Sequence, residues 1–101
     1  MSAPTLLVAA TPDALRREVV IANPQGLHMR PAAAFAKLAQ QYRSAVFVVY
    51  NDQRVNGKSP MEMLLLAAEP GTRLVVEVTG SDADQALNPL ADMLAAAGGE
   101  D

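Results

Sequence analysis

Apolar positions recur along the chain with two different periods, and each period predicts one kind of element. Alternation at every second residue, or a short β-branched run, predicts a strand. Such segments are residues 18–22, 45–50, 53–56 and 72–79. Apolar residues spaced three or four apart predict an amphipathic helix. These helices are expected at residues 29–42, from 59 to about 69, and at 83–97.

The predicted order of elements is therefore β-α-β-β-α-β-α, which indicates an α+β fold. Strands with two unlike faces and helices with one apolar stripe favour a single sheet covered on one side. Pro89 falls inside the last predicted helix, where a proline removes a backbone hydrogen bond. We expect a kink there, or a restart of the helix capped by Asn88.

Composition narrows the possible chemistry. The chain has 101 residues, enough for one small domain, and half of them are hydrophobic. It has no cysteine and one histidine, so disulfides and thiolate metal sites are excluded and no metal or other cofactor is expected. The net charge of −3 gives no electrostatic support for binding nucleic acid.

Residues 1–15 are expected to form a flexible leader, with residues 16–101 as the folded domain. A packed extension or a partner-binding segment is the alternative for the leader. Its apolar run, residues 5–10, is too short to span a bilayer, and no Lys or Arg precedes it as in a secretory signal. We therefore expect a cytoplasmic protein without membrane insertion.

The single histidine, His28, is the strongest candidate for chemistry. It lies between the turn at residues 23–26 and the start of the first predicted helix, and Arg30 follows two residues later. A neutral imidazole is a nucleophile, and the first turn of a helix favours a phosphate through its backbone N–H groups and dipole. His28 could thus accept a phosphoryl group that Arg30 helps to stabilise. The simpler alternatives are a structural histidine and a solvated arginine.

Ser59 has the features of a helix N-cap. Pro60 would occupy the first helical position, and Glu62 is placed to complete a capping box with Ser59. The sequence by itself therefore explains Ser59 as a structural residue.

Two segments carry a resemblance to a known family. The run Gly26-Leu27-His28-Met29-Arg30-Pro31-Ala32 resembles the active-site motif of HPr, the histidine phosphocarrier of the bacterial phosphotransferase system, and residues 56–61 resemble its regulatory serine segment. The resemblance covers about residues 17–97. It implies an open-faced β-sandwich, with four antiparallel strands covered on one face by three helices.

The resemblance also implies a function. His28 would take a phosphoryl group from a phosphohistidine of enzyme I and pass it to a histidine or cysteine of a IIA- or IIB-type partner. Arg30 would stabilise the phosphoryl group in transfer. Such a protein is a stoichiometric phosphocarrier rather than a turnover enzyme. Ser59 would be phosphorylated by an HPr kinase/phosphorylase, although Pro60 and Glu62 depart from the residues common in the family.

Several apolar residues near the two helix starts are candidates for docking partners. They are Leu27, Met29, Met61 and Met63, whereas Leu64 is expected to be buried. Methionine side chains suit a surface that meets several partners because they repack easily.

Two other functions fit the same residues. An HPr-like regulatory module, for example of a nitrogen-related branch, would act by binding a protein. A small ligand-binding α+β domain would perform no phosphoryl chemistry. The acid-labile phosphate that a phosphohistidine carries, lost when His28 is replaced, separates the phosphocarrier from both.

Overall fold

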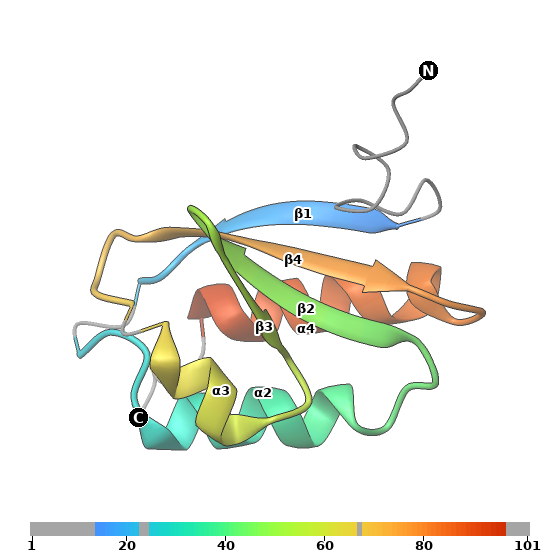
Figure 1. Cartoon of the computed structure of the whole chain (residues 1–101), viewed down its shortest axis with the longest axis horizontal. Coiled ribbons are helices and arrows are strands. Elements are labelled where there is room, and N and C mark those ends of the chain that lie inside the picture. The colour runs from blue at the N-terminus through green and yellow to red at the C-terminus, as the bar shows by residue number, and fades with distance from the viewer. Residues whose placement is uncertain (1–13, 23–24, 67, 97–101) are drawn as a thin grey trace.

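The computed structural model describes residues 14–22, 25–66 and 68–96. Within these residues the chain forms strands and helices in the order β-α-β-β-α-β-α (Figure 1). Their bounds are β1 (Leu15–Val20), α2 (Met29–Ala39), β2 (Ala45–Tyr50), β3 (Gln53–Asn56), α3 (Pro60–Leu65), β4 (Arg73–Thr79) and α4 (Ala83–Ala96).

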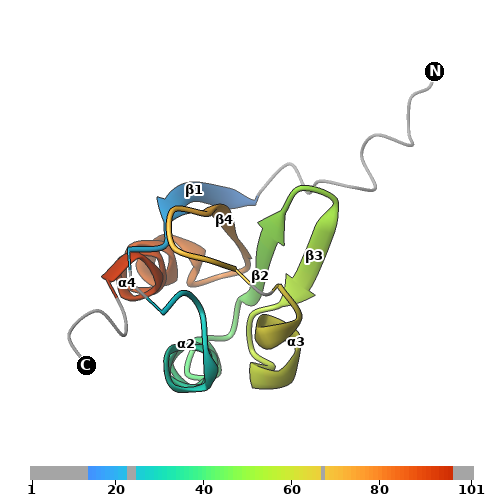
Figure 2. The same cartoon turned by 90° about the vertical axis from the view of Figure 1, so that its left-hand side faces the viewer.

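The described strands form one sheet in the order β1-β4-β2-β3, and every neighbouring pair is antiparallel. Helices α2, α3 and α4 all lie on the same side of this sheet (Figure 2). No described element covers the other side. The predicted open-faced α+β fold is confirmed.

The core lies between the sheet and the helices, because the strands alternate as their sequences predict. Val46, Val48 and Leu74 point toward the helices and are at most 1% exposed. From the helices, Phe35 and Leu90 meet them with no exposed surface. Side chains of this size bury most of the apolar area that stabilises a domain of this length.

Several elements end at residues other than those predicted. Helix α2 ends at Ala39 rather than at Tyr42, because the N–H groups of Gln41 and Tyr42 donate to carbonyls three residues earlier, at 3.0 and 3.1 Å. Such bonds tighten the last turn and end the α-helix. Helix α3 closes in the same way, where the Leu66 N–H donates to Met63.

The first strand is shifted toward the N-terminus relative to its prediction at residues 18–22. Its pairing with β4 runs from Leu15 opposite Val78 to Val20 opposite Arg73. The partner strand, rather than the β-branched run alone, decides which residues enter the sheet. Leu15 thus belongs to β1, and the predicted leader lies outside the described residues up to residue 13.

Helix α4 is a single helix from Ala83 to Ala96 that contains Pro89, so the expected restart at Asn88 is wrong. Pro89 is on the exposed side of the helix. The side chain of Asn88 does not cap a helix; its Oδ1 accepts a hydrogen bond from Arg17 of β1 at 3.0 Å. Arg17 also pairs with Asp92 at 2.9 Å, so it fastens α4 to the edge strand on both sides of the proline.

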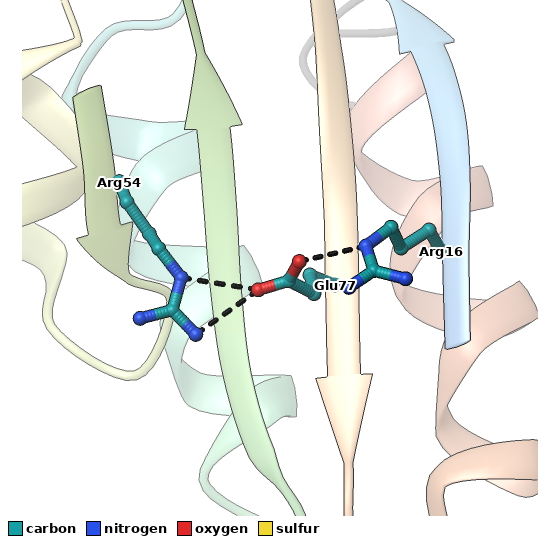
Figure 3. A network of polar contacts seen from close by, with 3 residues as sticks. All are labelled: Arg16, Arg54 and Glu77. Atoms are coloured by element: carbon teal, nitrogen blue, oxygen red, sulfur yellow. Dashed lines mark hydrogen bonds and ion pairs between the residues drawn. The ribbon is translucent and has the colours of Figure 1, made fainter. Parts of the chain in front are cut away.

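A buried carboxylate on the open side of the sheet is held by two arginines (Figure 3). Glu77 is 6% exposed, and its two oxygens accept from Arg16 at 2.8 Å and from Arg54 at 3.0 Å. The Arg54 guanidinium also lies 3.8 Å from the centroid of the Phe47 ring. The sequence pattern correctly places Glu77 opposite the core face. Its burial results from other strands, because the long arginine side chains of β1 and, across β2, of β3 cover it.

Asp82 joins the start of α4 to the segment before β2. Its carboxylate accepts a hydrogen bond from the Ser44 hydroxyl and from the N–H groups of Arg43 and Ser44 at 2.9 and 3.0 Å. The Ser44 hydroxyl, followed by the Arg43 N–H, holds the pKa of Asp82 below its usual range. Gly80 permits this approach, since a Cβ there would lie 2.6 Å from the Cα of Ser44.

Among the described helices, none is both long and apolar enough to cross a bilayer.

We expect Asp82→Asn to make the protein less sensitive to acid. A carboxyl whose pKa is lowered by folding stabilises the native state above its unfolded pKa, and this stabilisation is lost as the pH falls through the folded pKa. Urea unfolding should be measured between about pH 6 and about pH 2. At the upper end of this range Asp82→Asn should have a lower free energy of unfolding than the wild type. Over the whole range its free energy of unfolding should change less with pH. Asp84→Asn, an exposed change two residues later in the first turn of α4, is the control. A wild-type profile for Asp82→Asn would contradict the prediction.

Candidate functional site

His28 occupies the N-cap position of α2. Its backbone is extended, with φ −116° and ψ −171°, and its carbonyl accepts the N–H of Ala32 at 3.0 Å. The imidazole is half-buried and makes no capping hydrogen bond to the helix. The side chain therefore stands at the start of the helix without being used to stabilise it.

The residues before His28 are held by the connection between α3 and β4. The Leu27 N–H donates to the Ala68 carbonyl at 2.8 Å. Gly26 has φ +72°, and a Cβ on it would lie 2.5 Å from the same carbonyl oxygen. Only glycine meets both requirements, a left-handed backbone and a close approach to another chain segment. This explains the glycine two residues before the histidine.

Arg30 is the second residue of α2 and its side chain is exposed. The first turn of α2 contains no acidic residue. The first bond between residues four apart in α2 runs from the N–H of Ala32 to the carbonyl of His28, and the N–H groups at the start of a helix point out of its N-terminal end. The start of α2 thus combines the positive end of the helix dipole with a cationic side chain, and no acidic residue of its own first turn opposes an anion there.

Ser59 caps α3 as predicted, but the capping box is only half formed. Its Oγ accepts the Glu62 N–H at 3.2 Å, and Pro60 is the first helical residue. The Glu62 carboxylate accepts the N–H of Asn56 at 2.9 Å instead of the N–H of Ser59. The Ser59 N–H donates to the Asn56 carbonyl, so the reciprocal bond of the box has no donor.

The loop before Ser59 is fastened to the end of α2. The Gln40 side chain donates to the Lys58 carbonyl at 2.8 Å, and the Lys58 ammonium donates to the Tyr42 carbonyl at 2.9 Å. Because Leu27 contacts Ala68 at the other end of α3, the two helices run in opposite directions. His28 therefore lies beside the end of α3, and the two helix starts, around which a docking surface was expected, lie at opposite ends of this helix pair.

The structure divides the predicted docking residues into exposed and buried ones. Met29 and Met61 are 55% and 68% exposed. Leu27 and Met63 are 7% and 0% exposed and belong to the core, which corrects their expected place on the surface. Leu64, which was expected to be buried, is partly buried and packs against the core, whereas Met63 is completely buried.

Leu65 is an exposed apolar residue that the sequence reasoning missed. It is 66% exposed and follows Met61 by four residues, which places both on the same side of α3. The sequence does not single it out, because residues 63–66 are all apolar and their periodicity gives no preferred face. Met29, Met61 and Leu65 are from here on called the exposed apolar residues of α2 and α3.

Among the described residues, no three His, Cys, Asp or Glu side chains come together as a group that could hold a metal ion.

Residues 15–96 match the family described as "PTS HPr component phosphorylation site". The chain is 41% identical over 80 residues to the phosphocarrier protein HPr of Neisseria meningitidis, which covers 79% of this chain and 90% of that protein. The chain belongs to the HPr family. The crystal structure of an HPr from Bacillus anthracis matches with a TM-score of 0.76 at 32% identity, covering 80% of this chain and 96% of the other.

The chain also matches part of a longer protein. It is 37% identical over 95 residues to the multiphosphoryl transfer protein of Salmonella typhimurium, a match that spans 91% of this chain and 25% of that protein. Membership of the HPr family makes the chain a phosphocarrier of the phosphotransferase system, which acts with other proteins of that system.

We expect Ser59→Ala to lower the free energy of unfolding by about 1 kcal/mol, because the N–H of Glu62 loses its capping acceptor. Urea unfolding of this variant should be compared with Ser81→Ala, an exposed serine that begins no helix. Equal stability of the two variants would show that the cap does not stabilise α3.

Proposed function

We propose that His28 is the residue that carries the phosphoryl group, received from phospho-enzyme I and passed to IIA- or IIB-type partners. The observation that supports this most is the position of His28. It is the only histidine in the chain, it falls inside the family match, and its side chain stands unused at the start of α2. The proposed role is that of a stoichiometric carrier.

The transfer moves one phosphoryl group from a nitrogen of enzyme I to a nitrogen of His28, and then to a nitrogen or sulfur of the partner. A ring nitrogen of neutral His28 attacks the phosphorus of the phosphohistidine on enzyme I, the new P–N bond forms, and the P–N bond on enzyme I breaks. The histidine of enzyme I recovers its electron pair. The second transfer repeats the same step, with His28 as the leaving group and a histidine or cysteine of the partner as the nucleophile.

The start of α2 suits the charge that moves in this reaction. Phosphoryl transfer depends mostly on positioning and on stabilising charge at the three transferred oxygens. The positive end of the helix dipole faces His28, and Arg30 adds a cation two residues away. Because Arg30 is exposed, its guanidinium is accessible to a group held between two proteins.

The exposed apolar residues of α2 and α3 are the proposed docking surface. Met29 follows His28 directly, whereas Met61 and Leu65 stand on the neighbouring helix. Exposed large apolar side chains that gather beside a reactive group often mark a protein interface. Leu27 and Met63 would support this surface from the core rather than contact the partner.

Ser59 is proposed as a second phosphorylation site, modified by an HPr kinase/phosphorylase. The proposal is supported by the family resemblance of its segment and by its partial exposure. Glu62 lies one helical turn away and would repel a phosphate on Ser59. Pro60, which follows the serine, departs from the residue that is common in the family at this position.

We expect labelling with phosphoenolpyruvate and enzyme I to give an acid-labile, alkali-stable phosphate that His28→Ala abolishes. In rapid-quench measurements Arg30→Ala should still be labelled, but about tenfold more slowly or slower still, because a charged hydrogen bond to the phosphoryl group is lost. Lys37→Ala removes a cation at the other end of α2 and is the matched control. An unlabelled wild-type protein would favour a regulatory module over a carrier. Equal rates for Arg30→Ala and Lys37→Ala would remove Arg30 from the mechanism.

We expect incubation with an HPr kinase/phosphorylase and ATP to add one acid-stable phosphate, which mass spectrometry should locate at Ser59. Glu62→Gln should increase the rate of labelling, because it removes the repelling charge but retains an oxygen that can accept the Asn56 N–H. Unchanged labelling of Ser59→Ala would rule out this site.

A further inference from the structure

The segment between β1 and α2 is fastened at both of its described ends to one turn, residues 68–72. At the first end, the Ile21 N–H donates to the Thr72 carbonyl at 2.9 Å and the Gly71 N–H donates to the Ile21 carbonyl at 2.8 Å. At the second end, the Leu27 N–H donates to the Ala68 carbonyl at 2.8 Å. The geometry of this turn therefore sets where the chain enters α2.

One peptide group in the turn is bonded on both sides. The carbonyl of the Ala68–Glu69 peptide accepts from Leu27, and the N–H of the same peptide donates to Oγ1 of Thr72 at 3.1 Å. The Thr72 N–H donates in turn to the Glu69 carbonyl at 3.0 Å. Since a peptide group is planar, holding its N–H also fixes the direction of its carbonyl.

The space around that carbonyl leaves little freedom. A Cβ built on Gly26 would lie 2.5 Å from the Ala68 oxygen and 3.2 Å from the Cα of Glu69. The backbone before His28 thus packs directly against this peptide. A rotation of the peptide would either break the bond to Leu27 or press the oxygen against Gly26.

We propose that Thr72 is a positioning residue for phosphoryl transfer at His28. Its hydroxyl fixes the Ala68–Glu69 peptide, and the carbonyl of that peptide fixes Leu27, the residue before His28. Bonds that share one peptide group also polarise each other, so the Thr72 contact strengthens the bond to Leu27. The inference rests on the proposed role of His28. Thr72 acts through Ala68 and Leu27 and touches no reacting atom.

The test compares Thr72→Val, which removes the hydroxyl and retains the shape, with Thr72→Ser, which retains the hydroxyl. Thr79→Val makes the same change at the far end of β4 and is the control. We expect Thr72→Val to slow phosphoryl transfer from phospho-enzyme I by about threefold to tenfold, as for one lost hydrogen bond. Amide exchange at Leu27 should accelerate to a similar extent. Thr72→Ser should have the transfer rate and the Leu27 exchange rate of the wild type, and Thr79→Val should change neither rate.

Unchanged transfer and unchanged Leu27 exchange in Thr72→Val would overturn the inference, as would failure of Thr72→Ser to restore them. If Thr72→Val does not fold, Thr72→Ala compared with Thr72→Ser still isolates the hydroxyl, because both lack the methyl group. Labelling of the wild-type protein keeps the two proposals distinct. An unlabelled His28 refutes the carrier role, whereas labelling at equal rates in all variants refutes only the role of Thr72.

Discussion

The hydrogen bond from the Leu27 N–H to the Ala68 carbonyl is the contact on which the geometry around His28 depends. It ties the start of α2 to the turn that leads into β4, a central strand of the sheet. Gly26 has to adopt a left-handed backbone for this bond to form, and the Ala68 oxygen occupies the space where a larger residue would place its Cβ. The start of α2 is therefore held from the sheet through main-chain atoms, and the imidazole makes no capping hydrogen bond that would add to this support.

The opposite directions of α2 and α3 determine how the two proposed phosphorylation sites can influence each other. Ser59 stands at the start of α3, near the end of α2, whereas His28 stands beside the end of α3. The six residues of α3 span about 9 Å. Because the Debye length is about 8 Å at physiological salt, a charge on Ser59 would act on His28 only through considerable screening. Met61 lies two residues from Ser59, so the docking surface would feel that charge most directly.

Much of the fold and part of the site could be predicted from local patterns. The order of elements, the N-cap at Ser59 and the position of His28 at a helix start all follow from short segments of sequence, and the structure confirms them. The choice between buried and exposed methionines could not be predicted. Residues 61 and 63–66 are all apolar, so the periodicity gives no preferred face for α3. Packing against α2 and the sheet selects Met63 and Leu66 for the core and leaves Met61 and Leu65 exposed.

The sequence by itself determined the local features: which segments become strands and helices, where helices begin, and which residue is the only histidine. These depend on interactions between residues a few positions apart, whose spacing is visible in the chain. The tertiary structure alone decided which distant segments meet. The Ala68 carbonyl accepts the Leu27 N–H, and the Thr72 hydroxyl accepts the N–H of the same peptide group. On the other side of the sheet, Arg16 and Arg54 pair with Glu77 from two different strands. Backbone carbonyls are identical in every residue, so no sequence pattern can mark the one that supports the histidine.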